Sequence, residues 1–169
     1  SCIPHHIMLK SDRWIKEQAA LGMIEPFEPL LTRLVEDKRP GWFRQALSFG
    51  TSSFGYDLRL SPKEFKVFKH VPGTIMNPKA FNPANLETAR LREDEFGEYF
   101  ILPGHSYGLG VASEKLKMPP NITGICLGKS TYARMGIIAN LTPVEASWEG
   151  RLTLEFSNPS CADCRIYAN

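Results

Sequence analysis

Residues 151–158 read RLTLEFSN, and the alternation in this stretch decides the fold class. Because successive side chains of a β-strand point to opposite faces of its sheet, a strand here divides into an apolar and a polar face. The apolar face holds Leu152, Leu154 and Phe156, and the polar face holds Arg151, Thr153, Glu155 and Ser157. The stretch therefore predicts a half-buried strand. Spacing alone does not distinguish Glu155 from an ordinary solvated glutamate.

The same kind of run recurs from Ala46 onward, and Gly, Pro and Asn separate one run from the next. The runs are ALSFG (46–50), YDLRL (56–60), FKVFK (65–69), EYFIL (98–102), ITGICL (122–127), IIANL (137–141), RLTLEF (151–156) and RIYAN (165–169). Short strands between frequent turns are typical of β-barrels and β-sandwiches. Thirteen glycines and thirteen prolines favour the same class, so we expect a mainly β chain.

Three segments outside these runs carry other expectations. The polar pair Ser11–Asp12 supplies good helix N-caps and Gly22 a stop signal, which predicts a short N-terminal helix over 12–21. A further helical turn is expected over 30–35. Residues 82–97 are polar and charged, and we expect a loop or a short surface helix there.

The composition describes one globular unit. With 169 residues, 43% of them hydrophobic, a single domain over 8–169 is expected, and residues 1–7 are set aside as a short extension or a leftover of the expression vector. The net charge is +2 with both signs scattered, so neither nucleic acid nor a membrane is an expected partner. Four irregularly spaced cysteines and no apolar stretch of about 18 residues favour the cytoplasm.

Residues 128–136 read GKSTYARMG, which begins like the end of a phosphate-binding P-loop. The pattern G-x-x-x-x-G-K-[ST] requires a glycine where this chain has Thr123. A P-loop also leads into a long helix, whereas this segment soon enters the apolar run IIANL. A P-loop nucleotide triphosphatase is therefore excluded, and the lysine, hydroxyls and arginine of the segment need another explanation.

A zinc-dependent base deaminase is excluded by its missing ligands. Cys161 and Cys164 have C-x-x-C spacing, but zinc deaminases combine such a pair with an H-x-E motif. No glutamate stands two residues after any of the four histidines, which are His5, His6, His70 and His105. Two thiolates cannot complete a tetrahedral site, so we expect no zinc and two ordinary loop cysteines.

Six segments, in order along the chain, carry a resemblance to a known family. They are KSDRWI (10–15), GMIEPF (22–27), SSFGYDLR (52–59), EFKVF (64–68), ICLGKSTYARMGII (125–138) and TPVEASWEGRLTLEFSN (142–158). From about residue 8 to residue 169, the chain resembles the dCTP deaminases, zinc-independent enzymes of the trimeric dUTPase superfamily. The resemblance implies a distorted, jelly-roll-like β-barrel of the dUTPase type and a homotrimer with active sites between subunits.

The resemblance also implies a reaction and a set of site residues. The reaction is hydrolysis of dCTP to dUTP and ammonia, with Mg²⁺ bound through the triphosphate and dTTP as a candidate feedback inhibitor. Glu155 of the LEF triplet would donate and accept protons, assisted by Ser130 and Arg134. The expected nucleotide contacts are Lys129, Ser130, Thr131, Tyr132, Ala133, Arg134, Glu145, Thr153, Leu154 and Glu155.

The chemistry of cytosine hydrolysis fits a glutamate in this role. Water is a poor nucleophile toward C4, so a carboxylate must take its proton and later return protons to the ring and the departing amine. A cation such as Arg134 would lower the pKa of Glu155 and apolar walls would raise it, and the sequence leaves the balance between them open.

Two alternative functions stay open at this stage. Glu145 occupies the place of the aspartate in the dUTPase motif I-D-x-D-Y-R-G, so cleavage of dUTP, alone or beside deamination, is the first. Ala146 and Ser147 depart from the family pattern E-P-E-W-E-G. Relatives also continue past the segment matching Tyr167–Asn169 with a strand and a nucleotide-binding lid. If the chain ended at Asn169, a non-catalytic dNTP-binding relative would be the second alternative.

Overall fold

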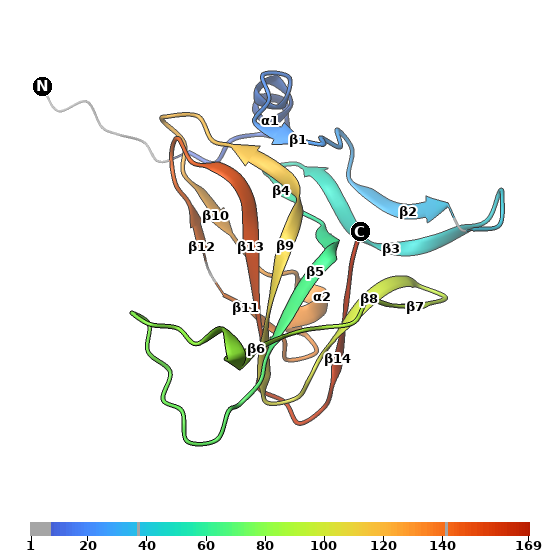
Figure 1. Ribbon diagram of the computed structural model, residues 1–169. Helices are drawn as coiled ribbons and strands as arrows, with labels where there is room; N and C mark the ends of the chain where they lie inside the picture. Colours follow the sequence, from blue (N-terminus) through green and yellow to red (C-terminus); the bar gives the residue numbers. More distant parts are fainter. Residues whose placement is uncertain (1–7, 37, 141) are drawn as a thin grey trace, which may run out of the picture.

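The computed structural model describes residues 8–36, 38–140 and 142–169, so the proposed extension 1–7 lies outside the described residues (Figure 1). The elements are α1 (Asp12–Ala19), β1 (Ile24–Glu25), β2 (Thr32–Glu36), β3 (Phe43–Ser52), β4 (Gly55–Asp57), β5 (Leu60–Phe68), the 3₁₀ turn η1 (Pro83–Asn85), β6 (Leu86–Thr88), β7 (Arg92–Asp94), β8 (Gly97–Leu102), β9 (Ser106–Lys117), β10 (Gly124–Cys126), α2 (Ser130–Ala133), β11 (Ile138–Ala139), β12 (Thr142–Val144), β13 (Glu149–Asn158) and β14 (Cys164–Tyr167). The prediction of a mainly β chain with a short N-terminal helix is confirmed.

The largest sheet is antiparallel and has the strand order β11-β13-β9-β5-β6, with β1 paired to β9. Its long central strands run side by side (Figure 1). The alternation predicted for β13 is confirmed, because Leu152 is buried and Leu154 and Phe156 pack against the core, whereas Arg151 and Thr153 are exposed. A period of two therefore places Glu155 on the face opposite the core.

Three smaller sheets complete the fold: β14-β8-β7, β2-β3-β4 and the pair β10-β12. The β2–β3 hairpin extends away from the main sheet. Helix α1 lies beside β1, at one end of the main sheet (Figure 1). Among the described residues the strand pairing does not close into a barrel.

The core has two parts. The first lies between the main sheet and the β14-β8-β7 sheet, where the rings of Phe65 and Phe100 stack at 5.1 Å. β9 approaches closely here, since a Cβ at Gly108 would lie 2.5 Å from the Phe65 ring. The second part, under α1, is made of Ile15, Met23, Ile24, Ala112, Leu116, Val144 and Leu152. The glycines of β9 therefore let the aromatic layer lie directly on its backbone.

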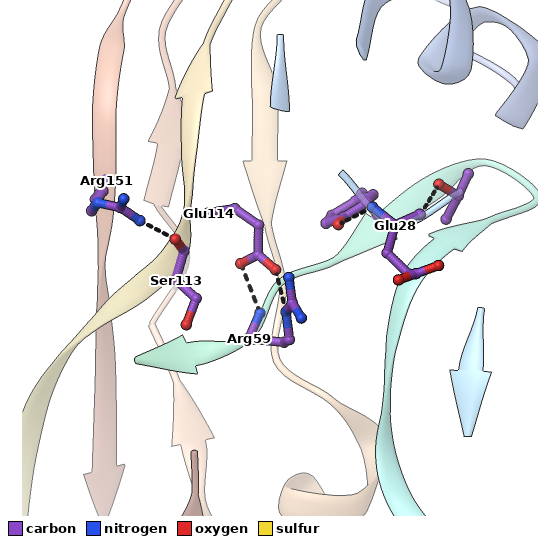
Figure 2. Close-up of polar contacts among 7 residues, drawn as sticks. Glu28, Arg59, Ser113, Glu114 and Arg151 are labelled. Atoms are coloured by element: carbon purple, nitrogen blue, oxygen red, sulfur yellow. Dashed lines mark hydrogen bonds and ion pairs between the residues drawn. The ribbon is translucent and has the colours of Figure 1, made fainter. Parts of the chain in front are cut away.

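A buried ion pair holds β9 to the start of β5. Glu114 is 0% exposed, and it accepts hydrogen bonds from the backbone N–H of Arg59 at 3.0 Å and from its Nε at 2.7 Å (Figure 2). On the neighbouring strand, Arg151 donates to the carbonyl of Ser113. Because an unpaired buried charge is costly, the two members of the Arg59–Glu114 pair require each other.

Two expectations from the sequence need correction. The helical turn expected over 30–35 is wrong, because residues 32–36 pair with β3 as the strand β2. The loop or short surface helix expected over 82–97 is only partly right, since the 3₁₀ turn η1 is followed by β6 and β7, which pair with β5 and β8. In both places pairing with another strand overrides a weak local preference. The N-terminal helix is confirmed, and it ends at Ala19.

Candidate active site

Glu155 lies in the middle of the main sheet, on the face away from the core. It stands opposite Leu109 of β9, and Leu109 stands opposite Lys66 of β5, so the three side chains form one row across the sheet. Glu155 is half-buried, and its carboxylate has no hydrogen bond or ion pair within the described part of the chain. Its carbonyl accepts a hydrogen bond from the N–H of Asn140 at 3.1 Å. The candidate site therefore contains a carboxylate without a hydrogen-bond partner in the described part of the chain, on a backbone that is held in place.

The GKSTYAR segment follows β10 and passes close to β11. Ala139 of β11 pairs with Phe156, the neighbour of Glu155. At Gly128 a Cβ would lie 2.8 Å from the Cβ of Ala139, which is closer than real Cβ atoms approach one another. Only glycine lets the segment lie this near β11, the strand that pairs with the one carrying Glu155.

Electrostatics place the start of the segment near the acid. Burial raises the pKa of the Cys126 thiol, and the negative charge of Glu155 raises it further. Cys126 is the last residue of β10 and lies three positions before Lys129. The charge of Glu155 therefore affects the pKa of a group just before the GKSTYAR segment.

Tyr132 fixes the single helical turn α2 to the core. Its hydroxyl accepts a hydrogen bond from the backbone N–H of Tyr167 at 2.9 Å, and its ring meets Phe156 edge-on at 6.4 Å. Burial raises the pKa of this hydroxyl. The side chain therefore points inward, and only the backbone of Tyr132 is left to face a ligand.

The remaining predicted side chains of this segment face outward. Ser130, Thr131, Ala133 and Arg134 are exposed. Within the described part of the chain, the polar side chains among them have no hydrogen-bond or ion-pair partner. The turn thus exposes two hydroxyls and a guanidinium that are available to bind a ligand.

Lys129 is already engaged. Its Nζ donates to Oδ2 of Asp57 at 2.5 Å and to Oγ of Ser48 at 2.9 Å, and the Ser48 hydroxyl lies 3.0 Å from the same Asp57 oxygen. Sequence reasoning missed both partners. The only available signal was the motif SSFGYDLR, which contains Asp57 but assigns it no role.

The other predicted residues divide between the surface and the core. Thr153 is exposed and stands opposite Val111, on the same face as Glu155. Leu154 packs inward against both core clusters. Glu145 is exposed, in the turn that precedes β13, and its carbonyl accepts from Trp148 N–H at 3.1 Å. Thr153 thus shares the face of Glu155, the GKSTYAR segment packs against β11 next to the strand of Glu155, and Glu145 lies on a separate turn.

No group of three or more His, Cys, Asp or Glu side chains is arranged to hold a metal ion in the described ranges 8–36, 38–140 and 142–169. Within the same ranges, no helix has the length and apolar character needed to cross a lipid bilayer.

Comparison with known proteins gives a single result. A family model described as dCTP deaminase-like matches residues 9–169. A protein from Laribacter hongkongensis named dCTP deaminase is 46% identical over 162 residues, which cover 95% of this chain and 79% of that protein. Proteins of the same name from Halorhodospira halophila and Polaromonas sp. are 46% and 45% identical, again over 95% of this chain and 79% of each relative.

Proposed function

The chain belongs to the dCTP deaminase-like family, and from that premise we propose that it hydrolyses dCTP to dUTP and ammonia. The observation that supports this proposal best is the half-buried carboxylate of Glu155, which has no partner in the described part of the chain and stands on a strand that pairs with β11, against which the GKSTYAR segment packs. A general acid–base group needs this combination of fixed position and free oxygens.

In the proposed reaction, Glu155 takes a proton from water as the oxygen adds to C4 of cytosine. The carboxylic acid then gives this proton to the ring nitrogen. Glu155 next takes the proton of the C4 hydroxyl and passes it to the amine as the C4–N bond breaks, so that ammonia leaves and the C4 oxygen becomes the carbonyl of uracil. Ser130 would hold the water or the amine by a hydrogen bond, and the cation of Arg134 would stabilise the ionised acid.

The nucleotide would lie along the turn. Lys129, Ser130 and Thr131 offer an ammonium and two hydroxyls to the phosphates, and the backbone at Tyr132 and Ala133 continues the same surface. Thr153 would contact the base or the sugar, and Leu154 would contribute through its backbone. Mg²⁺ would enter with the triphosphate as part of the substrate.

We propose a homotrimer in which each site draws on two subunits. Two features favour this: the carboxylate of Glu155 lacks a partner within the described part of its own chain, and Arg134 is exposed without one. Since dTTP carries the same triphosphate, it would compete for the turn and act as a feedback inhibitor. The cysteine usage favours the cytoplasm as the compartment.

The test is direct. The protein is incubated with dCTP and Mg²⁺, and ammonia and dUTP are measured. Glu155→Gln, which keeps the shape and removes the base, should lower kcat by at least about 100-fold. Full activity of this variant would refute the assignment of Glu155. The second candidate, dUTP cleavage through Glu145, is not favoured, because the compared relatives are all named dCTP deaminase.

A further inference from the structure

Lys129 is held in a closed triangle of three polar groups. Its ammonium donates to Asp57 Oδ2 and to Ser48 Oγ, and the Ser48 hydroxyl donates in turn to Asp57 Oδ2. Asp57 and Ser48 lie 72 and 81 residues away along the chain, on strands β4 and β3. The triangle therefore joins the GKSTYAR segment to a separate sheet.

The supports of the triangle are themselves rigid. Asp57 pairs with Gly50 in the β3–β4 ladder, and Ser48 lies two residues before that glycine on the same strand. The side chains of Lys129 and Asp57 are 27% and 31% exposed, so water screens this pair less than it screens a fully exposed one. A flexible lysine side chain is thus tied at its tip to two fixed points.

The donor count leaves capacity for a ligand. An ammonium has three N–H donors, and the triangle uses two of them. The third N–H remains for an anion outside the triangle. The loss of side-chain freedom that phosphate binding normally costs a lysine has already occurred in the folded chain.

We propose that Asp57, with Ser48, is the positioning residue that holds Lys129 in place for the phosphates of the substrate. The inference rests on the proposed function, in which Lys129 contacts the triphosphate. Asp57 itself carries a negative charge and would repel a polyanion, so its benefit must come through the ammonium that it orients. Asp57 therefore raises the affinity for phosphates only while Lys129 is present, and it lowers that affinity when Lys129 is removed.

The experiment combines steady-state deamination of dCTP with calorimetric binding of inorganic tripolyphosphate and of deoxycytidine. Asp57→Ala should raise KM for dCTP and the Kd of tripolyphosphate about tenfold, as expected for the loss of one charge-assisted contact. The Kd of deoxycytidine should stay within about twofold of the wild-type value, because it has no phosphate for Lys129 to hold. A general structural defect would weaken both ligands together.

The double variant gives the sharpest test. Lys129→Ala leaves the Asp57 carboxylate unpaired beside the polyanion, so Lys129→Ala with Asp57→Ala should bind tripolyphosphate at least as tightly as Lys129→Ala alone. If Asp57→Ala weakens binding equally with and without Lys129, or leaves binding unchanged in the wild type, the proposal is wrong. Should Asp57→Ala not fold, Asp57→Asn takes its place, because its amide keeps an oxygen acceptor.

A matched control is available on the main sheet. Glu149→Ala breaks the Lys115–Glu149 pair, which has the same 2.5 Å separation but lies in no part of the site, and it should leave every constant within about twofold. A wild-type protein that binds tripolyphosphate but releases no ammonia from dCTP would refute the proposed function. The role of Asp57 would still be decided by the binding data.

Discussion

Replacing Gly128 by alanine should damage the site without unfolding the protein. The added Cβ would lie 2.8 Å from the Cβ of Ala139, about 1 Å inside ordinary carbon–carbon contact. The cheapest relief is an outward shift of the segment that carries Lys129 and Ser130. A displacement near 1 Å at a reacting centre costs about 100-fold in rate, so kcat/KM for dCTP should fall by about 10- to 100-fold.

The same contact provides a rescue. Ala139→Gly removes the atom that clashes, and the next atoms of residue 139 lie at 3.6 and 3.8 Å from the new Cβ, which is ordinary contact. The double variant Gly128→Ala with Ala139→Gly should therefore recover most of kcat/KM. Gly124→Ala serves as the control on the preceding strand β10, because the nearest atom to its Cβ is 3.4 Å away, on Val144.

The assay is ammonia release from dCTP, with thermal unfolding measured in parallel to show that each variant is folded. Unchanged activity of Gly128→Ala would refute the reasoning. So would a folded double variant as slow as Gly128→Ala, because the loss would then arise from something other than the Ala139 contact.

Two further predictions concern the charges of Glu114 and Glu155. Glu114→Gln should lower the free energy of unfolding, measured in urea, by about 3 kcal/mol, because it leaves the largely buried Arg59 unpaired. The control Glu149→Gln breaks an exposed ion pair and should cost less than about 1 kcal/mol. Equal losses in the two variants would contradict the argument from burial. Glu155→Gln should make Cys126 react faster with iodoacetamide at pH 8, as measured by mass spectrometry. Removing the negative charge of Glu155 lowers the pKa of the Cys126 thiol and so raises its thiolate fraction. An unchanged reaction rate would show that the carboxylate lies too far from Cys126 to affect its pKa.

The parts of the fold that the sequence predicts are those set by short-range periodicity. The strand at 151–158 was predictable because its alternation is strict, and the N-terminal helix because polar N-caps and a glycine bound it. The strands β2, β6, β7 and the central β9 were among those missed, because their formation depends on partner strands and their own residues carry only weak local signals.

The site divides in the same way. The GKSTYAR turn and Glu155 are visible as motifs, but their surroundings depend on contacts between distant segments. Asp57 and Ser48 reach Lys129 only in the folded chain, and no spacing rule links residues 72 and 81 positions apart. The inward direction of Tyr132 likewise depends on Tyr167 and Phe156, which belong to other strands.

The contact between Tyr132 and the backbone of Tyr167 makes one amide a natural reporter. That N–H is covered by the hydroxyl of a residue in α2, so it meets solvent only when the helical turn separates from the last strand. Its rate of deuterium uptake therefore measures how often the turn opens. A ligand that binds to the turn would slow deuterium uptake at the N–H of Tyr167 without contacting strand β14.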